Sequence, residues 1–390
     1  MARLLRIVHV LAPARYGGLE RVVELLALAQ HTEGNDVHVI VSIGTGGEEH
    51  PLTASLRRGG VGVNEIRVPS RAYFRERREL HALITALAPD VVHSHGFRSD
   101  VLVGTVAPGL GLCTVSTAHG FVGGGMRGRA YEWLQRRIMR SCSAIVAVSR
   151  PLIAQLQESG IARDRIHFVP NAWVSLAPPL QRAEARQVLG LPMQGVIIGW
   201  VGRLSSEKGP DVMLEALADL PNEPQALLAM VGAGRELSAL QGLAARLGVT
   251  DRIRWVGEVP DAPRVFRAFD AFVLSSRTEG TPMVLLEAME AGVPIVATRV
   301  GGVGDVIGEY GGLLVPPSDP GSLSTAIRSV LLDRGAAQHR AAQAAIRLVR
   351  DFGVERWLSS YRRVYDAAIS GYGGGELGSS KGAGGDVHPQ

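Results

Sequence analysis

The chain has 390 residues and a formal net charge of +4; 46% of its residues are hydrophobic and 20% are charged. This length predicts two domains with sizeable cores. The modest basic excess, without a strongly basic face rich in aromatic residues, argues against nucleic acid as a partner.

The expected compartment follows from the cysteines and the apolar segments. The two cysteines, Cys113 and Cys142, exclude a disulfide framework and a cysteine metal cluster, and they indicate a reducing compartment. No uncharged apolar run of about 18 residues occurs, and Arg6 and His9 interrupt the apolar start of the chain. We therefore expect a cytoplasmic protein with no transmembrane helix and no secretory leader.

Strand-like apolar runs alternate with helical patterns in the first half of the chain. In chain order, strands are predicted at 4–11, 36–43, 90–96, 113–119 and 144–149, and helices at 18–30, 51–60, 79–89, 128–141 and 151–160. This alternation is typical of a parallel sheet with helices on both faces.

The pattern breaks at 172–192, which contains Pro178 and Pro179. It restarts with predicted strands at 195–204, 225–232, 253–259, 271–276, 294–299 and 311–317. We therefore predict an α/β protein with two doubly wound, Rossmann-like domains, 1–173 and 191–353, joined by a linker at 174–190. A helix at 354–370 is expected to cross back to the N-terminal domain. The Gly-rich tail, 371–390, is predicted to be disordered.

Four segments fit the place where open parallel sheets bind ligands, beyond the carboxyl ends of the strands. The first contains Gly17 and Gly18, which let a ligand approach the start of a helix; a tight turn is the alternative. The second contains Arg203 and Lys208, two cations that can hold a diphosphate without a metal; a solvated loop is the alternative. Neither segment carries a dinucleotide or P-loop signature.

The third segment ends a strand with His119, which could orient or donate to a sugar hydroxyl or a phosphate oxygen. A structural histidine is the alternative. His93 and His95 share one face of a strand and resemble metal ligands, but no third ligand is placed by the sequence. We interpret these two as structural or cleft-lining and expect no metal.

The fourth segment, 275–292, places Glu279 before a helix and Glu287 on it. Thr281 is predicted to be the N-cap and Pro282 the first helical residue. The free amides of the first helical turn attract anions, so two carboxylates here could hold hydroxyl groups on either side of a phosphate. Two ordinary surface glutamates are the alternative.

Taken together, the segments GGLERVV, TAHG, VGRLSSEKG and Glu279-x7-Glu287 with EAMEAGVPIVAT and Gly301-Gly302 resemble glycosyltransferase family 4 over residues 5–368. The resemblance implies a GT-B fold, a retaining reaction without metal or other cofactor, and a nucleotide-sugar donor such as a UDP- or GDP-sugar. It further implies that the N-terminal domain binds the acceptor, a sugar or lipid-linked sugar in polysaccharide, lipopolysaccharide or glycolipid synthesis. The absence of a D-x-D motif agrees with metal independence.

The resemblance also implies roles for individual residues. Arg203 and Lys208 would bind the diphosphate, Glu287 the ribose hydroxyls and Glu279 the hydroxyls of the donor sugar. His119 would contact the donor sugar near the reacting carbon. The remaining expected donor contacts are Gly17, Gly18, Gly280, Thr281, Pro282 and Met283, with the base near Val259.

Two rival interpretations remain at this point. One is a nucleotide-sugar epimerase or a phosphorylase on a similar fold. A phosphorylase would need a cofactor lysine or a free-phosphate site, and we find neither in the sequence, whereas an epimerase would convert the donor without an acceptor. The other is a sugar-nucleotide-binding subunit without turnover, against which the four charged residues Arg203, Lys208, Glu279 and Glu287 argue.

The charge of the chain is concentrated in its first half, where residues 1–173 hold 20 Arg or Lys against 14 Asp or Glu. Two segments carry much of the excess, 70–79 and 125–140. The second is predicted to be a basic amphipathic helix with Trp133 beside its arginines, which suits contact with anionic lipid. We therefore expect peripheral contact with the cytoplasmic face of a membrane, with packing of Trp133 and Leu134 into the domain as the alternative.

Overall fold

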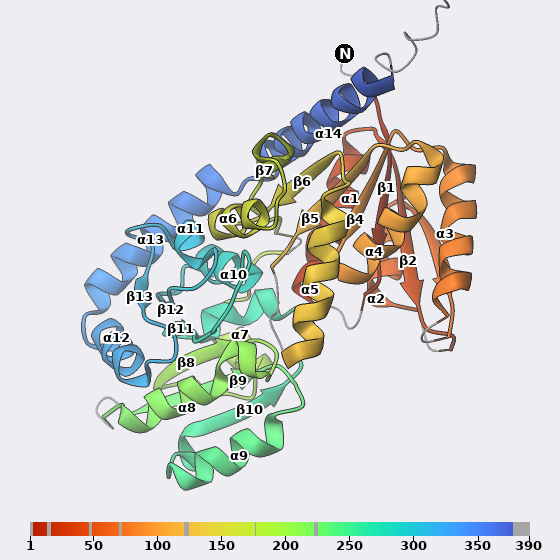
Figure 1. Ribbon diagram of the computed structural model, residues 1–390. Coiled ribbons are helices and arrows are strands. Elements are labelled where there is room, and N and C mark those ends of the chain that lie inside the picture. Colours follow the sequence, from red (N-terminus) through yellow and green to blue (C-terminus); the bar gives the residue numbers. More distant parts are fainter. Residues whose placement is uncertain are drawn as a thin grey trace, which may run out of the picture.

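The computed structural model describes residues 3–13, 17–46, 49–69, 72–120, 125–175, 177–221 and 225–376. They form two parallel β-sheets, each covered by helices, and the two domains lie against each other (Figure 1). The predicted pair of doubly wound α/β domains is confirmed. The carboxyl ends of the two sheets meet where Gly280 approaches His119.

The N-terminal sheet has seven parallel strands in the order β3-β2-β1-β4-β5-β6-β7, which reverses its direction beside β1 as in a doubly wound fold. The strands are β1 (Arg6–Leu11), β2 (Asp36–Ile43), β3 (Gly62–Arg67), β4 (Val91–His95), β5 (Thr114–Ala118), β6 (Ala144–Ala147) and β7 (Ile166–Phe168). The helices are α1 (Gly18–Thr32), α2 (Pro51–Arg58), α3 (Tyr73–Leu87), α4 (Phe97–Val106), α5 (Gly125–Met139) and α6 (Arg150–Glu158), with short 3-10 turns η1 (Ala107–Leu110) and η2 (Arg163–Arg165).

The central strands of this sheet are buried on both faces. Every residue of β4 and β5 is buried, and so are five of the six residues of β1. Helices α1 and α2 cover one face around Val23 and Val39, while α3 and α4 cover the other around Leu80 and Val92. The edge strands β3 and β7 escaped the sequence analysis because β3 is mostly half-buried and β7 has only three residues.

The C-terminal sheet has six parallel strands in the order β10-β9-β8-β11-β12-β13. The strands are β8 (Val196–Val201), β9 (Ala226–Val231), β10 (Ile253–Gly257), β11 (Ala271–Leu274), β12 (Ile295–Thr298) and β13 (Leu313–Val315). The helices are α7 (Arg182–Val188), α8 (Pro210–Asp219), α9 (Leu237–Arg246), α10 (Met283–Ala291), α11 (Val303–Ile307), α12 (Pro320–Leu332) and α13 (Arg334–Asp351), with the 3-10 turns η3 (Ser206–Lys208), η4 (Thr250–Arg252) and η5 (Ala262–Ala268).

The chain passes between the domains twice, and the two crossings lie side by side. The backbone amide of Trp173 donates to the carbonyl of Phe352 at 3.0 Å. Within the interval predicted as a linker, 182–188 forms α7 and packs on η5. Its buried Arg186 donates to Asp270 and to the carbonyls of Ala268, Pro192, Met193 and Gly195. This part is therefore an integral element of the C-terminal domain.

The last helix, α14 (Val354–Glu376), returns to the N-terminal domain and packs on β5, β6 and α1 (Figure 1). Trp357, Tyr361 and Tyr365 on this helix belong to the large apolar cluster that joins both domains. The helix continues six residues beyond the predicted end at 370, so the prediction of a disordered tail from 371 is wrong for 371–376. The physical reason is tertiary, since Tyr372 lines a cavity together with Pro108 and Cys142. Residues 377–390 lie outside the described residues.

Candidate functional site

The candidate site is built around a close backbone contact between the two domains. A Cβ atom on Gly280 would lie 1.9 Å from the carbonyl oxygen of His119, and one on Gly301 would lie 1.7 Å from that of Glu279. The amide of Gly302 also donates to the carbonyl of Gly280 at 2.9 Å. Only glycine fits at these positions, so the segment after Glu279 is clamped between the end of β5 and the loop after β12.

Thr281 contributes to this contact in a way that differs from the sequence prediction. Its hydroxyl donates to the carbonyl of Val148 in the N-terminal domain at 2.5 Å, and α10 begins at Met283 with Pro282 as its N-cap. The predicted roles of Thr281 as N-cap and Pro282 as first helical residue are therefore wrong. A buried carbonyl across the interface needs a hydrogen-bond partner, and the Thr281 hydroxyl supplies it. No side chain of the described residues caps the first-turn amides of α10.

Lys208 and Glu279 form the central charged pair of the site. The Lys208 Nζ lies 2.8 Å and 2.9 Å from the two carboxylate oxygens of Glu279, and the Ser276 hydroxyl donates to the same carboxylate at 2.6 Å. The side chain of Glu279 is 5% exposed and that of Lys208 is 29% exposed. The two residues come from the loops after β11 and β8, and the structure brings them together although 71 positions separate them.

Arg203 lies in the same loop as Lys208 but points into solvent. Its side chain is 70% exposed, and its only ion pair among the described residues is a 3.8 Å contact with Glu207. The loop itself is fixed by a close approach of Gly209 to the carbonyl of Ser275, whose hydroxyl also donates to the Gly209 carbonyl at 2.7 Å. The backbone of this loop is therefore held, while the Arg203 guanidinium is exposed to solvent.

Glu287 lies on α10 and is half-buried. Burial raises the pKa of this carboxyl to about 7, with the nearby Glu290 raising it further and the positive charge of Arg21 opposing both. Arg21 belongs to α1 of the N-terminal domain, so this carboxylate lies in the field of both domains. Val259, the residue expected near the base, is half-buried just beyond β10 and packs against the large apolar cluster.

The glycine pair stands at the start of α1. Gly17 is the N-cap, and its amide donates to the carboxylate of Glu20 at 3.0 Å. Among the described residues, a Cβ atom on Gly18 would meet nothing within 4 Å. The part of the chain that the structure describes therefore leaves room for a ligand group at this helix start, and its packing does not require a glycine there.

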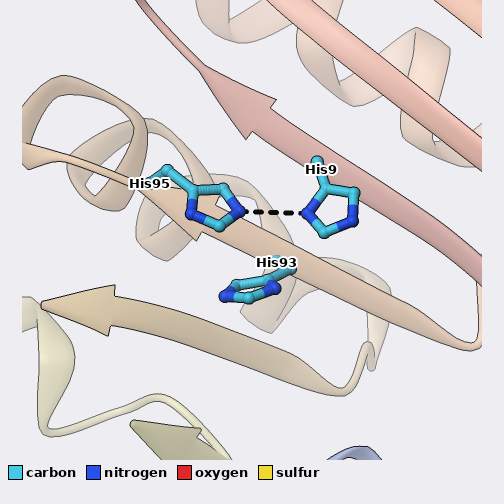
Figure 2. A group of neighbouring side chains, drawn as sticks. All are labelled: His9, His93 and His95. Atoms are coloured by element: carbon cyan, nitrogen blue, oxygen red, sulfur yellow. Dashed lines mark hydrogen bonds between the residues drawn. The ribbon is translucent and has the colours of Figure 1, made fainter. Parts of the chain in front are cut away.

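His119 is part of a group of four histidines beneath the site. His95 Nδ1 lies 3.3 Å from His119 Nε2, and His9 Nδ1 lies 3.0 Å from His95 Nε2. Figure 2 shows His9 and His95 facing each other, with the ring of His93 below them. As expected, His93 and His95 share a face of β4, with ring centroids 4.1 Å apart.

The structure thus adds the third histidine that the sequence did not place, His9 on β1. Three imidazoles this close could hold a transition-metal ion, and His9, His93 and His95 offer ligand atoms within 4.8 Å of one another. However, both ring nitrogens of each of them lie within hydrogen-bonding distance of a protein atom. The sequence signal for His9 was weak, because it came only from a histidine within an apolar strand adjacent to β4.

Sequence reasoning also missed residues that hold the domains together at the site. The backbone amide of Arg150, the first residue of α6, donates to Asp305 at 2.9 Å. A Cβ atom on Gly302 would lie 2.8 Å from that of Ser149. No local pattern marks these residues, since each makes its contact with the other domain.

The exposure of α5 and α3 bears on the predicted membrane contact. Trp133 is 67% exposed and Tyr131 is 56% exposed, whereas Leu134 and Ile138 are half-buried. On α3, Phe74 is almost fully exposed. Among the described residues, no helix is both long and apolar enough to span a membrane.

Comparison with known proteins places this geometry in a family. The model "Glycosyltransferase Family 4" matches residues 16–173, and "Glycosyl transferases group 1" matches residues 181–348. The chain is 33% identical to the lipopolysaccharide core biosynthesis mannosyltransferase LpsB of Rhizobium meliloti, over 62% of this chain and 70% of the relative. A D-inositol 3-phosphate glycosyltransferase of Salinispora arenicola is 36% identical over 49% of this chain and 46% of its own.

Two further matches span almost the whole chain. Glycogen synthase of Mycobacterium tuberculosis is 29% identical over 95% of both chains. The crystal structure of Anabaena HepE in complex with UDP and glucose has a TM-score of 0.81 and 19% identity, and the match covers 93% of this chain and 99% of that chain. At this identity the structural match shows the fold, which is GT-B.

Proposed function

The chain belongs to glycosyltransferase family 4 and is a glycosyltransferase that uses a nucleotide sugar, and from this premise we propose that it transfers a hexose from a UDP- or GDP-sugar to a hydroxyl group with retention at the anomeric carbon. The acceptor would be a sugar or a lipid-linked sugar in polysaccharide, lipopolysaccharide or glycolipid synthesis. Relatives named for a lipopolysaccharide core, an inositol phosphate and glycogen support this class of acceptor.

The observation that carries the proposal is the Lys208–Glu279 pair at the domain contact. Glu279 is held by Lys208 and Ser276 directly beside the clamped Gly280 backbone. A carboxylate in this position can accept hydrogen bonds from sugar hydroxyls, while the ammonium next to it can bind a phosphate oxygen. Glu279 and Lys208 would then meet the sugar and the diphosphate on either side of the bond that breaks.

The other residues would complete the donor site. Arg203 would turn from solvent onto the diphosphate, and Glu287 would accept from the ribose hydroxyls. Gly17 and Gly18 would close the site from the N-terminal domain. The segment Gly280–Met283 would meet the sugar and phosphate, with amide N–H groups from Gly280, Thr281 and Met283, since Pro282 has none. Val259 would lie against the base.

The reaction would be a displacement on one face of the sugar ring. The bond from the anomeric carbon to the diphosphate oxygen breaks, and the acceptor hydroxyl forms the new bond on the same face. The leaving diphosphate, stabilised by Lys208 and Arg203, takes up the proton that the acceptor hydroxyl loses. The rate would come from electrostatic stabilisation of the departing charge, with neither a covalent nucleophile nor a metal ion.

A panel of UDP-, GDP- and ADP-sugars tests the donor. A donor that binds the folded state raises the melting temperature by mass action, so the true donor should give the largest shift. NMR of the product then shows whether the anomeric configuration is retained. Inversion would contradict the retaining mechanism, and the absence of any shift with nucleotide sugars would contradict the donor site.

We further propose that α5 and the start of α3 hold the protein against anionic membrane at the cytoplasmic face, where a lipid-linked acceptor would lie. The exposed Trp133 and Tyr131 together with the exposed Arg129 and Arg137 support this proposal. The alternative, in which Trp133 packs into the domain, does not fit its exposure. Leu134 is half-buried, so for this residue partial packing into the domain agrees with the alternative.

Vesicle co-sedimentation at low and high salt tests the membrane proposal. Wild-type protein should bind anionic vesicles at low salt and leave them at high salt. Arg129→Gln/Arg137→Gln should weaken this binding, whereas Arg246→Gln/Arg254→Gln removes the same charge from exposed positions of the C-terminal domain and should not. If wild type ignores anionic vesicles at low salt, a soluble acceptor becomes the better proposal.

A further inference from the structure

A continuous row of hydrogen-bonding side chains leads from the candidate site into the N-terminal domain. It runs from His119 to His95 at 3.3 Å, from His95 to His9 at 3.0 Å and from His9 to the side-chain oxygen of Gln30, Oε1, at 2.8 Å. The Gln30 amide nitrogen then donates to the Tyr365 hydroxyl at 3.1 Å. We call these five residues the histidine row.

The row ends on α14, the helix that returns from the C-terminal domain. The Tyr365 hydroxyl also lies 2.8 Å from His93 Nδ1, and His93 Nε2 lies 2.7 Å from the Thr117 hydroxyl. Among the described residues, no carboxylate or cationic side chain is hydrogen-bonded to any member of the row. The hydrogen bonds of the row are therefore made among imidazole, amide and hydroxyl groups.

The histidines of the row are held in their neutral form. Burial lowers the pKa of His9 and of His119 to about 4, and it lowers the pKa of His95 well below its ordinary value. A neutral imidazole carries one N–H and one bare nitrogen, so each ring can donate at one end only. The direction of one hydrogen bond consequently fixes the direction of all the others.

Gln30 supplies that direction. Since its amide nitrogen donates to Tyr365, its carbonyl oxygen must accept from the Nε2–H of His9. His9 Nδ1 is then bare and accepts from the Nε2–H of His95. His95 Nδ1 is in turn bare and accepts from the Nε2–H of His119. His119 is left with a bare Nδ1, to which no described group is hydrogen-bonded.

We propose that Gln30 and Tyr365 are positioning residues that hold His119 as its Nε2–H tautomer, so that the site presents a hydrogen-bond acceptor to a hydroxyl group of the donor sugar. This inference rests on the proposed function of the site. It excludes one expectation from the sequence, because a bare Nδ1 can neither donate to a sugar oxygen nor bind a phosphate oxygen. A donor sugar lacking that hydroxyl would leave the nitrogen unpaired and should be a poor substrate.

Two alternative arrangements predict the opposite tautomer. If the Gln30 amide were reversed, every hydrogen bond of the row would reverse and His119 would carry its proton on Nδ1. In the second alternative, a metal ion held by His9, His93 and His95 would bind the lone pair on Nε2 of His95. It would leave Nδ1–H of His95 to donate to His119 Nε2. The tautomer of His119 therefore distinguishes the proposed row from both alternatives.

NMR of the full chain labelled with ¹⁵N-histidine measures this tautomer directly, and the signal of His119 is identified by its loss in His119→Ala. We expect a protonated Nε2 and an unprotonated Nδ1 in the unliganded protein at neutral pH. An Nδ1–H tautomer or an imidazolium ion would overturn the proposal. This measurement needs neither a donor nor activity, so it can succeed or fail independently of the proposed transferase reaction.

A pair of variants tests the role of Gln30 and Tyr365. Gln30→Leu and Tyr365→Phe should each give a mixture of His119 tautomers and lower kcat/KM for the sugar donor by about tenfold, while binding of the free nucleoside diphosphate stays as in wild type. Tyr361→Phe removes a neighbouring hydroxyl of α14 that lies outside the row and should change neither. An unchanged His119 tautomer in both variants would overturn the assigned role. A loss of nucleoside diphosphate binding as large as the loss of kcat/KM would also overturn it, because it would indicate a structural effect.

Discussion

The C-terminal domain contributes a partly buried ion pair to the site, whereas the N-terminal domain contributes the imidazole of His119 and the glycine pair at the start of α1. Lys208 and Glu279 form an ion pair held by loops at the ends of β8 and β11. His119 ends a row in which every member is uncharged. A diphosphate carries full negative charge and a hexose carries none. Under the proposed function, Lys208 would therefore bind the phosphate in one domain and His119 would meet part of the sugar in the other.

The largest expected effect comes from removing the charge of the C-terminal side. Lys208→Ala and Arg203→Ala should each lower turnover by at least ~10²-fold, because each removes a cation from the departing diphosphate. Steady-state kinetics with the identified donor, together with circular dichroism to confirm folding, measures this. Near wild-type turnover in either folded variant would contradict the diphosphate assignment.

The Lys208 variant has a matched control for stability. Lys208→Ala leaves the buried carboxylate of Glu279 without its cation, which should cost about 1–3 kcal/mol of the free energy of unfolding. Lys208→Ala/Glu279→Gln removes the unpaired charge as well and should recover most of that stability without recovering turnover. Recovery of both would show that the pair is structural only.

The next largest effect is expected from disturbing the backbone contact between Gly280 and His119, which joins the two domains at the site. Gly280→Ala would place a Cβ atom 1.9 Å from the backbone oxygen of His119, and a backbone atom cannot move aside as a side chain can. The domains should separate slightly and kcat/KM should fall roughly 30-fold, since misplacement of the reacting groups is costly. Gly304→Ala on α11, where a Cβ atom meets no described atom within 4 Å, serves as the control. Equal activities of the two variants would contradict a functional role for the contact.

A smaller effect follows from the protonation of Glu287, whose pKa of about 7 lies above the usual value because of burial. Only the ionised carboxylate accepts two ribose hydroxyls, so donor affinity should rise about tenfold from pH 6 to pH 8. Glu287→Gln should flatten this dependence, as isothermal titration at several pH values would show. A pH-independent affinity in the wild type would remove Glu287 from the donor site.

The same group affects stability in the opposite sense. The folded carboxyl binds its proton up to about pH 7, whereas the unfolded chain releases it near its ordinary value of 4.5. Between these values the folded state binds more protons, so the contribution of Glu287 to the free energy of unfolding falls as pH rises. Glu287→Gln should lack this contribution in chemical denaturation across that range.

The sequence predicted the fold, the family and the enzyme class, all of which are confirmed, because apolar periodicity and motif spacing are local properties of the chain. The roles of the site residues stay predictions. The contacts that the sequence could not predict are made between segments far apart in the chain. The Thr281 hydroxyl donates to the Val148 carbonyl across the interface, and the histidine row joins residues from 9 to 365. No spacing within one segment shows either arrangement.

The smallest effect is expected from shortening the C-terminal end of α14, which lies outside the site. Two deletions distinguish the helical residues that pack on the N-terminal domain from the Gly-rich residues after them. Deleting residues 377–390, which are Gly-rich, should leave melting temperature and activity nearly unchanged. Deleting residues 371–390 also removes Tyr372, which lines the cavity beside Pro108 and Cys142, and should cost about 1 kcal/mol of the free energy of unfolding while activity is retained. Differential scanning calorimetry of the two truncated chains measures the difference. Equal melting temperatures would show that the added helical turn contributes nothing to stability, and lost activity in the longer deletion would mean that α14 acts on the site through its end as well as through Tyr365.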